Sequence, residues 1–105
     1  MAQWQVYRNA NPATRGYTPY LLDVQADLLH TLSTTVVAPL RPISGLTGEL
    51  MGSLTPVFNM EGALHAMITP QLAGISRKQL GQPVKDLSAQ RDVIVTAIDL
   101  LITGI

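Results

Sequence analysis

The chain has 105 residues, with seven basic and seven acidic side chains, no cysteine, and 47% hydrophobic residues. This length fits one domain, and the absence of cysteine excludes disulfides and thiolate chemistry. The basic residues are scattered, so the cationic cluster that direct nucleic-acid binding needs is missing. So many apolar residues on a small domain indicate an oligomer or partner surface, and we expect a homodimer.

The first part of the chain predicts a β-hairpin. Residues 3–8 alternate polar and apolar side chains, which is typical of a half-buried strand. Residues 9–16 are rich in turn formers and predict an exposed, mobile loop. Residues 20–24 predict the returning strand.

The middle of the chain predicts a third strand and a second hairpin. Residues 35–38 are β-branched or small, and the strand should end at Pro39 because proline has no N–H to donate. Residues 54–58 and 63–69 predict two strands joined by the turn 59–62, in which Gly62 supplies a positive φ.

The last segment changes to helical spacing. From Ser88, the expected N-cap, apolar residues recur three and four positions apart, and Gly104 should end the helix in a left-handed conformation. The recurring residues are Ile94, Ala97, Ile98, Leu101, Ile102 and Ile105. Strands followed by one helix predict an α+β, mainly β, barrel-like domain that spans residues 1–105.

The usual signatures of catalysis are absent from the sequence. It contains no glycine-rich phosphate loop, no metal-ligand spacing and no G-x-S-x-G motif, so we expect no cofactor, no metal and no catalytic residue. His30 and His65 are expected to lie at the surface, and Asp23 and Asp27 to be turn or cap residues. Because there is no signal-peptide pattern and no apolar run of membrane-spanning length, we expect a cytoplasmic protein without a membrane partner.

The end of the helix predicts a partner surface. Asp92, Thr96, Asp99 and Thr103 form a polar stripe, for which a solvated helix face is the ordinary explanation. Asp99, however, lies near the negative end of the helix dipole, where an acid costs about 0.3–1 kcal/mol. The chain also ends in residues 102–105, which are largely apolar. An apolar and acidic surface suits a partner that is basic and partly apolar.

Four segments of the sequence resemble the CcdB toxins in order and spacing: Asp23–Leu29, Val37–Leu40, Pro83–Ser88 and Gly104–Ile105. The resemblance implies a homodimer of small SH3-like antiparallel β-barrels with a C-terminal helix, as in CcdB, Kid and MazF. It also implies a toxin of a toxin–antitoxin system that binds the DNA gyrase A subunit and traps the gyrase–cleaved DNA complex. A CcdA-like antitoxin would neutralise it through a disordered segment that folds on binding.

The resemblance also implies which residues bind gyrase: Leu28, Leu29, Asp99, Ile102, Thr103, Gly104 and Ile105. For Leu28 and Leu29 an ordinary core position is an equally good explanation. Thr103 stands where the family pattern has tryptophan, and threonine cannot stack on an arginine as that ring does. We expect the antitoxin surface to include the loop from Arg8 to Tyr17.

Two other functions remain open. The related Kid and MazF toxins cleave mRNA, so the fold alone is compatible with an endoribonuclease. The departure at Thr103 is compatible with a degenerate relative that binds an antitoxin but no longer poisons gyrase.

Overall fold

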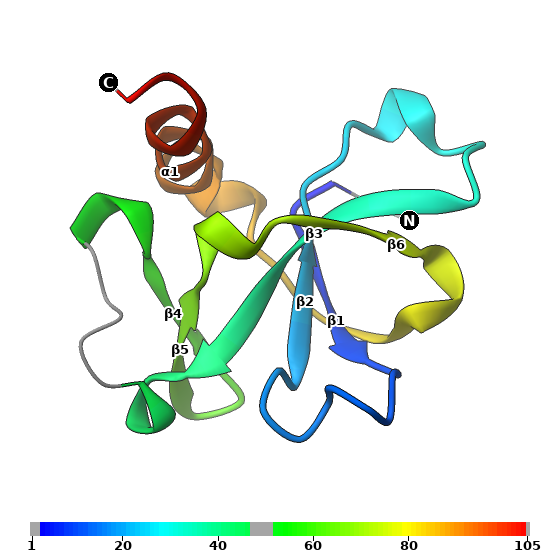
Figure 1. Cartoon of the computed structure of the whole chain (residues 1–105), viewed down its shortest axis with the longest axis horizontal. Helices are drawn as coiled ribbons and strands as arrows, with labels where there is room; N and C mark the ends of the chain where they lie inside the picture. Colours follow the sequence, from blue (N-terminus) through cyan, green and yellow to red (C-terminus); the bar gives the residue numbers. More distant parts are fainter. Residues whose placement is uncertain (1–2, 47–51, 105) are drawn as a thin grey trace.

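The computed structural model of the chain describes residues 3–46 and 52–104, and Figure 1 shows their arrangement. The described residues form one seven-stranded antiparallel sheet and one α-helix. The strands are β1 (Gln5–Asn9), β2 (Tyr20–Asp23), β3 (Thr34–Pro42), β4 (Val57–Met60), β5 (Ala63–Met67), β6 (Ala73–Ser76) and β7 (Leu80–Asp86), and the helix is α1 (Arg91–Thr103). The predicted mainly β fold with a C-terminal helix is therefore confirmed.

The sheet curls into a half-barrel. Its strands follow the order β4-β5-β3-β2-β1-β7, and β6 pairs with the first part of β3. The predicted hairpins are present: β1 pairs with β2, and β4 with β5. The strands β6 and β7 were missing from the sequence prediction, since neither alternates clearly between buried and exposed residues.

The core lies between the concave face of the sheet and α1. Adjacent residues of a strand point to opposite faces, so Leu22 enters this core whereas Leu21 faces the other side of the sheet. The core consists of Val6, Tyr20, Leu22, Ala38, Leu40, Phe58, Met60, Met67, Leu87, Ile94 and Ala97.

The prediction that the third strand ends at Pro39 was wrong, since β3 continues to Pro42. Along its outer side β3 pairs first with β6, up to Val37, and then with β5, from Leu40. Pro39 lies between these two partners, and its carbonyl accepts a hydrogen bond from the Ile68 N–H at 2.9 Å. The N–H and C=O of one strand residue point to the same side, so the missing N–H faces a gap between partner strands.

The second hairpin has a tighter turn than predicted. Strand β4 extends through Met60, and only Glu61 and Gly62 connect it to β5. Their φ angles are 52° and 90°, as required by a two-residue turn with positive φ at both positions. The prediction that Gly62 supplies a positive φ is confirmed.

The helix begins later than predicted. Residues Ser88–Gln90 form a 3-10 turn, and α1 starts at Arg91 without a side-chain cap. Ser88 is therefore not the N-cap. Its N–H instead donates to Asp86 Oδ1 at 2.7 Å, and this bond lowers the pKa of the Asp86 carboxyl.

Candidate functional site

The C-terminal half of α1 projects an apolar surface. Ile94 and Ala97 are fully buried in the core, but Leu101 is 38% and Ile102 73% exposed. Figure 1 shows this end of the helix extending away from the sheet. The residues with apolar spacing therefore belong to the core from Ile94 to Ile98 and to the surface at Leu101 and Ile102.

The end of α1 has the conformation that the sequence predicts. Gly104 is left-handed, with a φ of 75°, and its N–H donates to the Leu100 carbonyl at 3.0 Å. The Thr103 hydroxyl donates to the Asp99 carbonyl at 2.7 Å, so part of its hydrogen-bonding capacity is satisfied within the helix. Ile105, also predicted to bind gyrase, lies outside the described residues.

The polar stripe of α1 is exposed along its full length, from Asp92 to Thr103. Asp99 is in the last turns, and no basic residue is present in the last turn of the helix. A carboxylate is disfavoured there by the helix dipole. The side chain thus offers a partner a negative charge beside the exposed Ile102.

Leu28 and Leu29 are surface residues. They belong to the 3-10 turn η1 (Asp27–Leu29), which contains no buried residue. Leu28 is 86% and Leu29 43% exposed. Their assignment to the core is excluded.

The structure does not bring these predicted site residues into one patch. In Figure 1, η1 lies in the loop between β2 and β3, on the opposite side of the molecule from the C-terminal end of α1. Within one chain they form two separate apolar surfaces, which we call the helix-end surface (Asp99, Leu101, Ile102, Thr103 and Gly104) and the loop surface (Leu28 and Leu29).

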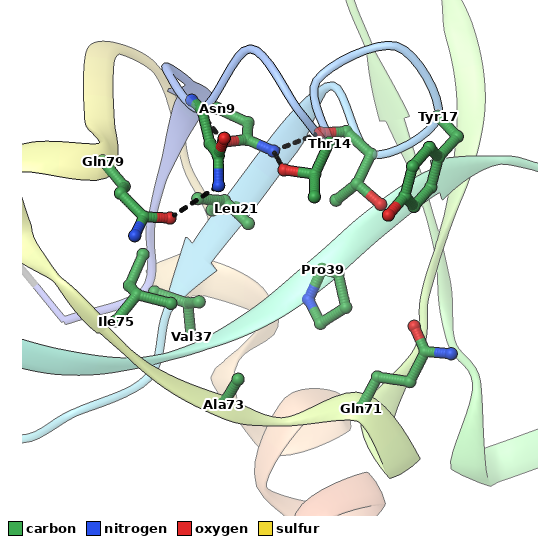
Figure 2. A pocket seen from close by; sticks show the side chains of 12 residues that line it. Asn9, Thr14, Tyr17, Leu21, Val37, Pro39, Gln71, Ala73, Ile75 and Gln79 are labelled. Atoms are coloured by element: carbon green, nitrogen blue, oxygen red, sulfur yellow. Dashed lines mark hydrogen bonds between the residues drawn. The ribbon is translucent and has the colours of Figure 1, made fainter.

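A pocket of about 300 Å³ opens on the face of the sheet opposite the core. Leu21, Val37 and Pro39 form its apolar floor, and Figure 2 shows amide and hydroxyl side chains around its rim. The rim residues come from the end of β1, the β1–β2 loop and residues 71–79, namely Asn9, Asn11, Thr14, Tyr17, Gln71 and Gln79. None of the lining residues is charged.

The β1–β2 loop is more ordered by hydrogen bonds than its composition predicts. Asn9 is only 6% exposed. Its amide nitrogen donates to Thr14 Oγ1 and to the Thr18 carbonyl, each at 2.9 Å, and its Oδ1 accepts from the Asn11 N–H at 2.9 Å. Tyr17, by contrast, is 55% exposed at the edge of the pocket.

The structure also assembles a polar cluster that no sequence pattern predicted. Glu61, in the β4–β5 turn, accepts hydrogen bonds from the Tyr20 hydroxyl and, at 2.6 Å, from Arg8 Nη2. The Tyr20 ring meets the His65 ring edge-on, with centroids 4.9 Å apart. The prediction that His65 lies at the surface was wrong, since it is 5% exposed and its Nδ1 is 2.9 Å from the Ala63 carbonyl.

The ionisation of this cluster follows from its contacts. The hydrogen bonds from Tyr20 and Arg8 hold the pKa of the Glu61 carboxyl below its ordinary value. Burial, with the nearby carboxylate, raises the pKa of the Tyr20 phenol. Glu61 is therefore a carboxylate and Tyr20 a neutral hydroxyl at neutral pH. Together with Lys85, which donates to the Asn59 carbonyl at 2.9 Å, these residues link the β4–β5 hairpin to β1, β2 and β7.

Neither a metal cluster nor a membrane-spanning segment is visible in residues 3–46 and 52–104. These residues contain no group of three or more histidine, aspartate or glutamate side chains arranged to hold an ion. Their helices are too short or too polar to cross a membrane.

Comparison with known proteins gives a family and a fold. The family described as CcdB protein matches residues 3–104. The structure is similar to that of an endoribonuclease in complex with its cognate antitoxin from mycobacterial species. The TM-score is 0.71 at 16% sequence identity, covering 97% of this chain and 94% of the other. At 16% sequence identity, this similarity shows a shared fold and nothing more.

Proposed function

Because the chain belongs to the CcdB family of toxins from toxin–antitoxin systems, we propose that it binds the DNA gyrase A subunit and traps the gyrase–cleaved DNA complex. Replication and transcription are then blocked, although the chain itself makes and breaks no covalent bond. The observation that carries this proposal is the exposure of the helix-end surface, where Ile102 is 73% exposed beside Asp99.

The chemistry of the helix-end surface suits a protein partner. Burying Ile102 and Leu101 against an apolar surface removes them from water, which is favourable by roughly 25 cal/mol per Å². Asp99 selects for a partner with a nearby cation, since a buried unpaired carboxylate is costly. Gly104 has no neighbouring heavy atom within 4 Å of where a Cβ would lie, so a partner backbone can approach it closely.

The loop surface adds a second contact if the chain is the predicted homodimer. The turn η1, which carries Leu28 and Leu29, lies on the opposite side of the molecule from the C-terminal end of α1 (Figure 1). In a two-fold dimer each surface occurs twice, and the loop surface of one protomer can share a partner with the helix-end surface of the other.

Gyrase binding can be tested with matched substitutions of exposed apolar residues. We expect Ile102→Ala to weaken binding to the gyrase A dimerisation fragment about tenfold or more, as for a central interface residue. Leu64→Ala is the control, since Leu64 is 47% exposed on the β4–β5 hairpin. A deletion of residues 103–105 should abolish toxicity in cells that lack an antitoxin. Full toxicity of that deletion would refute the role of the helix end.

We place the antitoxin at the pocket beside the β1–β2 loop. A rim of amides and hydroxyls over an apolar floor suits an uncharged side chain from a segment that folds on binding. The exposed ring of Tyr17 then covers the bound segment. Tyr17→Ala should weaken binding of a CcdA-like antitoxin and leave gyrase binding unchanged. Equal weakening of both would contradict separate surfaces.

A second candidate function is RNA cleavage. The observation that favours it is the cluster of Arg8, Tyr20, Glu61 and His65, which combines a carboxylate, a phenol, a guanidinium and an imidazole. General acid–base catalysis requires such groups, although a carboxylate with a lowered pKa is a weak base. Incubation of the purified chain with single-stranded RNA tests this function. Cleavage that is lost in Glu61→Gln would support it, and intact RNA would exclude it.

A further inference from the structure

Two residues outside the loop hold the loop surface in place, namely Arg77 and Gln3, whose N–H donates to Asp27 Oδ1 at 2.6 Å. Arg77 Nε donates to the Leu32 carbonyl at 2.6 Å, and Nη2 donates to the Leu29 carbonyl at 3.3 Å. The Arg77 N–H donates to the Ser33 carbonyl at 3.0 Å. A guanidinium is planar and has five donors, so it can hold several carbonyls in a fixed geometry. Arg77 thus fixes the path of the chain around Leu29 and Leu32.

Arg77 is itself held by a buried acid. Its Nη1 is 3.9 Å from Asp23 Oδ2, and the exposed fractions of the two side chains are 17% and 4%. Asp23 Oδ1 accepts hydrogen bonds from Thr35 Oγ1 at 2.8 Å and from the Gln25 N–H at 3.1 Å. Asp23 therefore joins the end of β2, the start of β3 and Arg77 into one polar scaffold beneath the loop.

Apolar packing contributes little to the position of this loop. The turn η1 has no buried residue, and Leu28 and Leu32 are 86% and 47% exposed. Within the loop, short-range backbone bonds join Leu29 N–H to the Ala26 carbonyl at 3.0 Å and Leu32 N–H to the Leu29 carbonyl at 3.1 Å. A single turn of this kind is marginal by itself. We therefore expect the contacts from outside the loop, those of Arg77 with the Leu29 and Leu32 carbonyls and that of Gln3 with Asp27, to keep one conformation.

We propose that Arg77, which pairs with Asp23, is a positioning residue. It fixes the loop conformation in which Leu28 and Leu29 bind the partner protein. The identity of that partner, the gyrase A subunit, rests on the proposed function. A loop that is already ordered loses less conformational freedom on binding, so preorganisation raises affinity without any contact between Arg77 and gyrase.

The test uses the full chain and compares Arg77→Ala with Lys78→Ala, which removes an exposed basic side chain from the same turn. Hydrogen exchange of the amides of residues 27–33 is one measurement, and affinity for the gyrase A dimerisation fragment is the other. We expect Arg77→Ala to speed loop exchange and weaken gyrase binding, each roughly tenfold. Lys78→Ala should change neither loop exchange nor gyrase affinity. Arg77→Lys should have an intermediate effect on both, because lysine keeps the positive charge but lacks the planar, forked set of donors of a guanidinium.

Two further variants separate the possible failures. Arg77→Ala leaves Asp23 buried without its cation, so the double variant Asp23→Asn with Arg77→Ala supplies a loosened loop without a buried charge. Unchanged loop exchange in folded Arg77 variants would overturn the proposal, whatever happens to gyrase binding. Faster loop exchange with gyrase affinity kept, while Leu28→Ala lowers that affinity, would also overturn it. If neither Leu28→Ala nor Ile102→Ala affects gyrase binding, the proposed function fails, and loop exchange alone decides whether Arg77 holds the loop.

Discussion

The two halves of α1 carry the same apolar spacing but have different surroundings. In the first half, Ile94 and Ala97 are fully buried against the sheet, whereas in the second half Leu101 and Ile102 are 38% and 73% exposed. The helix extends beyond the part of the sheet against which it packs. Periodicity thus predicts which residues share a helix face, but the extent of the neighbouring sheet decides which of them form the core. Substitutions at Ile94 and Ala97 should therefore act on stability, and those at Leu101 and Ile102 on binding.

The largest difference is expected between Ile94→Ala and Ile102→Ala. Removing the fully buried Ile94 side chain should lower the free energy of unfolding by about 2–5 kcal/mol, because it leaves a cavity in the core. Ile102→Ala should change it by about 0.5 kcal/mol or less, as for other surface positions. Urea unfolding of both variants gives the two values. Similar losses would mean that the second half of the helix is also part of the folded core.

A tryptophan at position 103 should strengthen partner binding by the second half of α1. Thr103→Trp restores a ring at the exposed helix end, and stacking on a gyrase cation should raise affinity by on the order of 1–2 kcal/mol. Thr96→Trp is the matched control, since Thr96 is on the same exposed stripe about two turns earlier. Titration of each variant with the gyrase A fragment measures the gain. An equal gain at both positions would indicate nonspecific apolar binding.

The two aspartates of α1 should have small effects of opposite sign on stability. Asp92 is in the first turn, where the helix dipole favours an acid, and Asp99 is near the end, where it does not. Asp92→Asn should therefore lower the free energy of unfolding and Asp99→Asn raise it, each by about 0.3–1 kcal/mol at low salt. Thermal unfolding at low and high salt tests the pair. Shifts of the same sign would contradict a dipole origin.

Local patterns predicted the elements whose residues lie close together in the sequence. The hairpin turn at Gly62, the helix and its left-handed end at Gly104 are examples, since each depends on neighbouring residues. Strand β7 was missed because Gly81 and Pro83 interrupt it and because no residue in it is fully buried. The continuation of β3 through Pro39 depends on a change of partner strand, which the sequence does not display.

The sequence predicted those candidate site residues that are exposed and chemically suited to a partner. It did not predict contacts between residues that are far apart in the chain. Family resemblance pointed to Ile102 and Leu28, both of which are well exposed. The Arg8–Glu61 and Arg77–Leu29 contacts join residues that are 53 and 48 positions apart, respectively, so no local sequence pattern predicts them. The burial of His65 likewise depends on the approach of Tyr20 from another hairpin.

Among the residues that the structure describes, β4 and β7 end the main strand path of the sheet and β6 pairs with β3 alone, and such edges limit how this toxin can be recognised. An open edge strand normally invites another strand to pair with it, either from a partner or from an aggregating copy. Strand β4 has only four residues, and β7 carries Pro83 and Lys85, both of which discourage such pairing. These two edges are therefore poor templates for β-augmentation. A partner that approaches them must recognise side chains, which ties specificity to residue identity.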